Sequence, residues 1–195
     1  MERFPSGQRG QTVNLLAQPS KVRILLSPLR NGLLRKRETL FFYYGKKVRM
    51  GNCFYEKGLN FECQGCNYCC SSEPGYVFLS ENDIKRLSEG LSMDRQSFLD
   101  TYCRTVDMGA FKMISLLEKE NYDCIFLQEG GCKVYPYRPV QCQTYPFWAH
   151  VLEDQSSWDE ESKSCPGINK GNLYTKKEIE AKLKQRVGND PVMIL

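Results

Sequence analysis

Over the last three quarters of this chain, short apolar runs alternate with short polar segments. This pattern predicts short strands and short helices. Residues 75–79, 111–116 and 124–127 are short apolar runs rich in β-branched and aromatic side chains, so they predict strands. The glycine-rich segment 128–132 that follows the third run predicts a turn.

Two helices are predicted between the first and second strands. Ser80 and Asp83 have the spacing of a helix-start capping box, which predicts a helix to about residue 89, ended by Gly90. Ser92 is expected to cap a second helix, which is predicted to end at about residue 104. The apolar side chains of this helix would all lie on one face.

Two more helices are predicted nearer the C-terminus. Residues 137–145 have the pattern of a short helix with Pro139 in its first turn. Thr175 and Glu178 form a second capping box, and the helix that they begin is expected to end at about residue 186. The predicted fold class is therefore α+β: a small, irregular, metal-organised domain with short strands and helices.

Residues 1–49 differ from the rest of the chain. They contain no cysteine, proline and glycine interrupt each apolar stretch, and eleven basic against two acidic residues give a charge of +9. Residues 4–28 resemble a transfer-RNA gene read as codons, and Met50 is a natural alternative start. We therefore expect 1–49 to be a spurious or disordered extension. An RNA-binding or membrane-surface arm is the alternative, which the lack of an apolar stripe disfavours.

Residues 50–195 are expected to form one cysteine-cluster domain. Sixteen basic and 21 acidic residues give this part a charge of −5, which argues against a nucleic-acid partner. Apolar runs are too short to span a membrane, and no export signal is visible, so a cytoplasmic protein is predicted. A protein partner is compatible with the sequence, which does not identify one.

Eight of the ten cysteines form one framework, with four in a Cys-x-x-Cys-x-x-Cys-Cys run and four that follow singly: Cys63, Cys66, Cys69, Cys70, Cys124, Cys132, Cys142 and Cys165. Zinc and iron–sulfur clusters need several soft thiolates converging within a few ångströms. Gly65 and Asn67 suit the left-handed backbone of a tight metal-binding loop. Disulfides are the alternative, and they would need an oxidising compartment.

Spacing alone leaves the identity and number of the metal centres open. Cys63, Cys66 and Cys69 have the spacing of iron–sulfur ferredoxins, whereas Cys63 and Cys66 alone also fit a zinc knuckle. The eight thiols suit one four-thiolate centre with four spare thiols, or two four-thiolate centres. The expected cofactor is an iron–sulfur cluster or iron, with zinc as the alternative.

Other residues near the framework are weaker candidates. Cys103 is expected to be a small buried hydrophobe in a helix, Cys53 lies outside the framework, and His150 is expected to pack rather than to bind metal. Arg138 is either a loop ion-pair partner or a cofactor-binding cation beside the thiolates. Aromatic residues around Cys142 are expected to form core or to exclude water from the centre: Tyr135, Tyr137, Tyr145, Phe147 and Trp148.

The order and flanks of these cysteines resemble the YkgJ-type cysteine-cluster family of bacteria, also called the CxxCxxCC zinc- or iron-chelating domain. The resemblance covers 61–167 and rests on the segments 61–70, 77–83, 124–127, 132–139, 142–147 and 165–167. The chain departs from the common pattern at Asn67, Tyr68 and Gln143, which leaves the thiols intact. The resemblance implies metal chelation without specifying a reaction.

Three functions are therefore compatible with the sequence. The first is a metalloprotein with a Cys-ligated iron–sulfur or iron centre in a redox or accessory role. The second is a structural zinc domain that binds a partner. The third is a cluster-dependent methyl-transferring or redox enzyme, which the resemblance suggests because a flagellin lysine N-methylase carries such a cluster. Whether the chain is an enzyme stays open.

Overall fold

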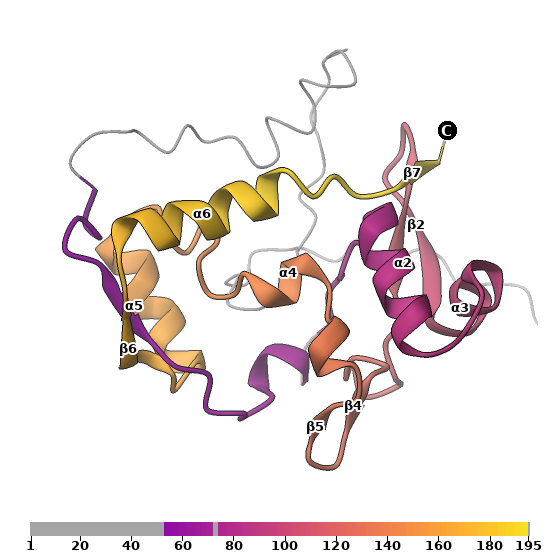
Figure 1. Cartoon of the computed structure of the whole chain (residues 1–195), viewed down its shortest axis with the longest axis horizontal. Coiled ribbons are helices and arrows are strands. Elements are labelled where there is room, and N and C mark those ends of the chain that lie inside the picture. Colours follow the sequence, from indigo (N-terminus) through magenta and orange to yellow (C-terminus); the bar gives the residue numbers. More distant parts are fainter. Residues whose placement is uncertain (1–52, 72–73, 195) are drawn as a thin grey trace, which may run out of the picture.

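A computed structural model describes residues 53–71 and 74–194, which form two groups of elements joined by a central region (Figure 1). The expected extension 1–49 and Met50 lie outside the described residues. One group contains β1 (Leu59–Phe61), α5 (Gln155–Ser164), β6 (Ile168–Tyr174) and α6 (Lys176–Val187). The other contains α2 (Glu81–Gly90), α3 (Arg95–Tyr102), β2 (Cys103–Asp107), β3 (Lys112–Leu116) and β7 (Met193–Ile194). Short strands and helices together confirm the α+β fold class.

The first group packs around its own aromatic core. β1 and β6 pair antiparallel, and Phe147 stacks on the fully buried Trp158 of α5. Asp154 caps α5 by accepting from the backbone N–H of Ser157. The sequence analysis missed α5, although Asp154 is a favourable N-cap residue and Trp158 supplies an apolar side for the helix.

The second group has a three-stranded antiparallel sheet in the order β2-β3-β7. The capping box of Ser80 and Asp83 begins α2 as predicted. The expected cap of the next helix was wrong, because Asp94 rather than Ser92 accepts the N-terminal hydrogen bonds of α3. That helix also ends at Tyr102, so Cys103 begins β2 instead of lying in a helix.

Two of the three predicted strands do not form as predicted. Residues 75–79 are extended, but they form only an isolated bridge between Phe78 and Ser115 beside β3. Residues 124–127 were wrongly predicted as a strand, because the N–H of Leu127 donates to the carbonyl of Cys124 and closes a turn that buries Phe126. β4 (Leu127–Gln128) and β5 (Gly131–Cys132) then form a hairpin, which contains the predicted turn.

The central region consists of short helices. The 3-10 helices η1 (Tyr68–Cys70) and η2 (Tyr135–Tyr137) and the single-turn α4 (Val140–Gln143) lie between the two groups in Figure 1. The predicted helix 137–145 is broken because Pro139 holds Arg138 in an extended conformation, so Pro139 precedes α4 instead of lying inside it.

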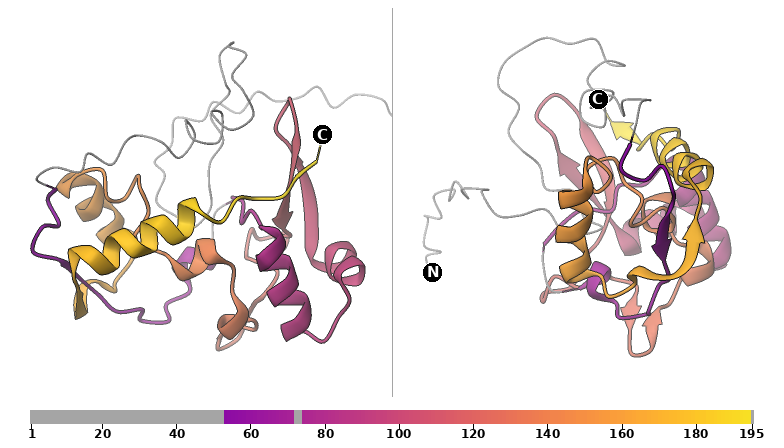
Figure 2. Two further views of the ribbon diagram at one scale, coloured as in Figure 1. Left: turned by 45° about the horizontal axis from the view of Figure 1, so that its top comes forward. Right: turned by 90° about the vertical axis from the view of Figure 1, so that its left-hand side faces the viewer.

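The C-terminal segment connects the two groups. The capping box of Thr175 and Glu178 begins α6 as predicted. The chain after α6 then crosses from the first group to β7, which pairs with β3 of the second group (Figures 1 and 2).

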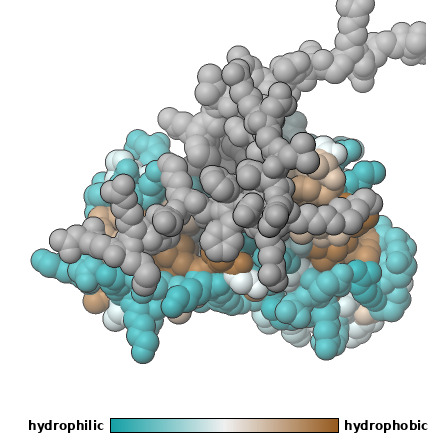
Figure 3. Space-filling model, turned by 90° about the horizontal axis from the view of Figure 1, so that it is seen from above, coloured by the Kyte–Doolittle hydropathy of each residue, from teal (hydrophilic) through white to brown (hydrophobic). Residues whose placement is uncertain are grey.

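Within residues 53–71 and 74–194, every helix is too short or too polar to cross a lipid bilayer. Figure 3 shows hydrophilic side chains around most of one face, with apolar side chains between them.

Candidate metal centre

All eight cysteines of the framework line one cavity of about 210 Å³ in the central region. They reach it from η1 and the loop before it, from the turn before β4, from β5, from α4 and from the segment after α5. Cys53 and Cys103 are not among its lining residues, which matches their place outside the framework. All ten cysteines are present as thiols. The structure thus brings together the residues that the sequence singled out.

The loop that carries the first four cysteines turns through two left-handed residues. Gly65 has φ 62° and Asn67 has φ 58°, as the sequence predicted for a tight loop. After Asn67 the chain enters η1, which places the sulfurs of Cys69 and Cys70 3.6 Å apart. Contact with Cys70, followed by burial, raises the pKa of the Cys69 thiol above its ordinary value.

The pairing of β1 with β6 positions Cys165. Phe61 pairs with Ile168, and the N–H of Glu62 donates to the carbonyl of Gly167 over 3.1 Å. A Cβ atom at Gly167 would lie 2.1 Å from the carbonyl oxygen of Glu62, so only glycine permits this approach. Cys165 is consequently held near the loop that follows Phe61.

The surroundings of the Cys165 thiol shift its pKa in both directions. Burial raises its pKa, whereas a hydrogen bond with Tyr145 and backbone N–H groups of Gly167 and Ile168 lower it. The single O–H of Tyr145 donates to the buried Glu161 over 2.7 Å, which fixes the phenol ring. Groups that lower the pKa of a thiol favour the thiolate, the form that binds metal.

Cys70, Cys124 and Cys132 are held together by backbone contacts. The N–H of Cys124 donates to the carbonyl of Cys70 over 2.8 Å, and Leu127 pairs with Cys132 across the hairpin. Burial raises the pKa of the Cys132 thiol, while the N–H of Val134 acts in the opposite direction. The positive charge of Arg138 also lowers this pKa.

α4 carries Cys142 to the cavity. Burial raises the pKa of this thiol well above its ordinary value, and the nearby Cys70, Cys124 and Cys132 thiols raise it further because like charges repel. Cys142 packs against the hydrophobic cores of both groups of elements. It therefore lies at the boundary between them.

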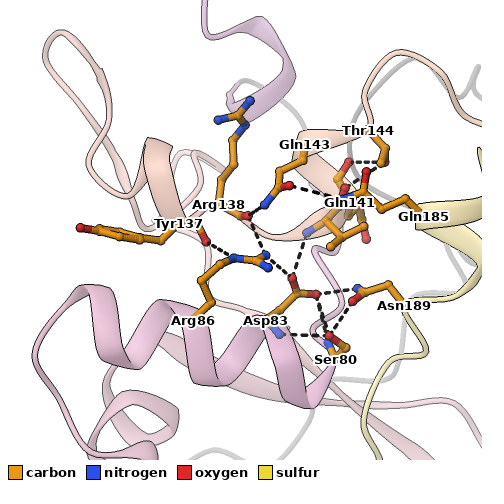
Figure 4. A network of polar contacts seen from close by, with 11 residues as sticks. Ser80, Asp83, Arg86, Tyr137, Arg138, Gln141, Gln143, Thr144, Gln185 and Asn189 are labelled. Atoms are coloured by element: carbon orange, nitrogen blue, oxygen red, sulfur yellow. Dashed lines mark hydrogen bonds and ion pairs between the residues drawn. The ribbon is translucent and has the colours of Figure 1, made fainter. Parts of the chain in front are cut away.

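A buried carboxylate fixes the start of α4 (Figure 4). Asp83 is fully buried, and its Oδ1 accepts from the N–H of Val140 over 2.9 Å and from Arg86 over 2.7 Å. Arg86 also donates to the carbonyl of Arg138. Asp83 thus caps its own helix and supplies the N-terminal acceptor that Pro139 lacks.

Gln141 ties the same helix to the rest of the protein. Its side chain donates to the carbonyl of Tyr76 and accepts from the buried Arg186 of α6 over 3.0 Å. Its carbonyl accepts from the indole N–H of Trp148. Both groups of elements therefore hold the segment that carries Cys142, and sequence reasoning missed this because the contacts with Tyr76 and Arg186 join distant residues.

The cavity walls are largely aromatic and aliphatic. Tyr135, Tyr145 and Phe147 line the cavity, as the sequence suggested, together with Phe61, Phe126 and Tyr174. Tyr137 and Trp148 are not among its lining residues. Apolar walls exclude water, which strengthens thiolate–metal interactions and tunes a redox potential.

Two cations face the thiols. Arg138 and Lys182 both line the cavity, and the Arg138 guanidinium stacks 3.8 Å from the centre of the Tyr135 ring. In Figure 4 the Arg138 side chain points away from the Asp83 network. Its positive charge lowers the pKa of Cys132, and its role as a cofactor-binding cation stays a prediction. His150 contacts Trp148 and is not a lining residue of the cavity.

The donor set fits zinc or iron. Eight soft thiol ligands in a cavity with apolar walls suit these metals, whereas oxygen-preferring Mg²⁺ or Ca²⁺ would find few ligands. Among the described residues, no three His, Cys, Asp or Glu side chains are already arranged as a metal site.

Comparison with known proteins identifies related sequences. The family model described as "Putative zinc- or iron-chelating domain" (CxxCxxCC) matches residues 62–166. The uncharacterized protein MJ0939 of Methanocaldococcus jannaschii is 26% identical over 130 residues, which cover 64% of this chain and 43% of the relative. No solved structure matches the chain significantly.

Proposed function

Because the chain belongs to the CxxCxxCC family of zinc- or iron-chelating domains, we propose that its cavity holds a cysteine-ligated iron–sulfur or iron centre with a redox or accessory role. One observation carries the proposal: all eight framework thiols, and neither of the other two, line the same cavity. All-thiolate coordination is typical of iron–sulfur clusters.

The size and walls of the cavity favour a cluster over a single ion. Its volume of about 210 Å³ is several times the roughly 30 Å³ that one water occupies in the liquid, so it has room for more than one ion. Backbone N–H groups lower the pKa of the Cys132 and Cys165 thiols, against the effect of burial. Hydrogen bonds to sulfur and apolar surroundings are the protein features that set the potential of such clusters.

A structural zinc site is the second candidate, and the division of the fold favours it. The two groups of elements have separate hydrophobic cores, and Cys142 packs against both. A metal held between them would join the two halves and stabilise the fold. This role requires a closed four-ligand site and no reaction.

Analysis of anaerobically purified protein separates the two candidates. An iron–sulfur protein is expected to be brown and to contain iron with acid-labile sulfide, whereas a zinc protein is colourless and contains zinc only. Iron without sulfide would indicate a mononuclear iron site. A cytoplasmic location and the absence of nucleic-acid and membrane partners stay predictions, and a protein partner, which the sequence does not identify, stays compatible with them. Protein that binds neither metal, even after anaerobic reconstitution, would overturn the proposal.

A further inference from the structure

We propose that the eight thiols form two adjacent four-thiol centres, the first from Cys63, Cys66, Cys69 and Cys165 and the second from Cys70, Cys124, Cys132 and Cys142. This inference rests on the proposed function and goes beyond it, because it assigns each cysteine to one of two sites. It is argued from the backbone contacts that place each thiol.

The first set belongs to the group that contains β1 and β6. Cys63 follows β1 by two residues and Cys165 precedes β6 by three, so the β1–β6 pairing brings them to the same end of the ladder. The hydrogen bond between Glu62 and Gly167 closes this end. Cys66 lies in the loop between Cys63 and Cys69, and Cys69 packs against the hydrophobic core of this group.

The second set belongs to the group that contains α2 and β3. The backbone bond from Cys124 to Cys70 and the β4–β5 hairpin hold three of its cysteines together. Asp83 holds α4, which supplies the fourth, Cys142. Cys124, Cys132 and Cys142 all pack against the same hydrophobic core, which includes Phe126 and Val134.

Cys69 and Cys70 place the two centres side by side. Cys69 packs against the first core, whereas the Cys70 carbonyl accepts from Cys124, so consecutive residues serve different halves. Their sulfurs are 3.6 Å apart, which makes the two centres direct neighbours. Arg138 and Lys182 line the cavity, where they offset the negative charge that eight thiolates concentrate.

Variants in each set test the assignment on the full chain. Cys165→Ser disrupts the first set and Cys132→Ser the second, while Cys103→Ser alters a half-buried cysteine that does not line the cavity. Iron, acid-labile sulfide and zinc are measured per chain after anaerobic purification and reconstitution. We expect each single variant of a set to retain about half of the wild-type metal, the double variant to retain none, and Cys103→Ser to retain all of it.

A single variant that loses all the metal, or that retains all of it, would overturn the two-centre assignment. If a variant fails to fold, Co²⁺ titration of the unaltered, metal-free protein gives a second measurement. The thiolate–cobalt absorbance should stop rising at two equivalents per chain, and an end point at one would overturn the assignment. Wild-type protein that binds no metal at all would instead overturn the proposed function, so the two failures are distinguishable.

Discussion

Replacing Asp83 with asparagine should destabilise the protein strongly, although the two side chains have nearly the same shape. The Oδ2 atom of Asp83 accepts from the N–H of Ser80 over 3.2 Å and from Asn189 over 2.6 Å. Its Oδ1 atom accepts from Val140 and Arg86. The asparagine amide has only one accepting oxygen, and its NH₂ group would face donors. The donors on either Oδ1 or Oδ2 therefore lose their acceptor.

The magnitude follows from burial. Removing one partner of a buried charge pair lowers the free energy of unfolding by about 3–5 kcal/mol. The Arg86 side chain is 33% exposed, so water solvates its charge and reduces this loss. We therefore expect the free energy of unfolding to decrease by about 3 kcal/mol. For a chain of this size, 1 kcal/mol shifts the melting temperature by roughly 2–4 °C, which gives a decrease of about 6–12 °C.

Thermal unfolding followed by circular dichroism measures this decrease, with Glu81→Gln as the matched control. Glu81 lies in the same helix but forms an exposed ion pair with Arg95, which is worth about 0–1 kcal/mol. Since Asp83 holds α4, Asp83→Asn should also lower metal content, whereas the control should not. A melting temperature for Asp83→Asn no lower than that of the control would refute the role assigned to this carboxylate.

Four further predictions follow from the site. Gly167→Ala should lower the free energy of unfolding by about 1–3 kcal/mol and also lower metal content, because the added methyl group collides with the carbonyl of Glu62. An unchanged urea unfolding curve would contradict this. Cys66→Ser should lower metal content and melting temperature together, whereas Cys103→Ser should leave metal content unchanged by elemental analysis. A chelator should lower the melting temperature sharply, because thiolate–metal binding contributes on the order of 10 kcal/mol to folding; chelated protein with its full melting temperature would indicate a labile site. Burial raises the pKa of Cys103 from 9.0 to about 12, so the protonated thiol is favoured in the folded state. Metal-free protein should therefore lose stability between pH 9.0 and about 12, and Cys103→Ser should lose less in a pH series of melting curves.

Local sequence signals predicted the parts of the fold that depend on neighbouring residues. The capping boxes at Ser80 and Thr175 each need a partner only three residues away, so both helix starts were found. The cap of α3 was misplaced by two residues because Ser92 and Asp94 are both favourable N-cap residues. The left-handed backbone at Gly65 and Asn67 was also predictable from residue type.

Contacts between distant residues were not predictable in this way. The pairing of β1 with β6 joins residues more than a hundred positions apart and explains why Cys165 lies near the Cys63 loop. Asp83 was visible as a helix cap, but its bond to Val140, 57 residues later, depends on how α2 packs against α4. Spacing therefore identified the eight cysteines, and only the fold suggests how to divide them.

X-ray absorption spectroscopy at the edge of the bound metal tests the central claim most directly, because it reports the ligand atoms themselves. Anaerobically purified protein should show sulfur as the only first-shell ligand, at about 2.3 Å. An iron–sulfur cluster adds scattering from a second iron, which a lone zinc or iron ion lacks. A first shell dominated by nitrogen or oxygen would contradict the account, because it would show that the metal lies outside the cavity that the eight thiols line.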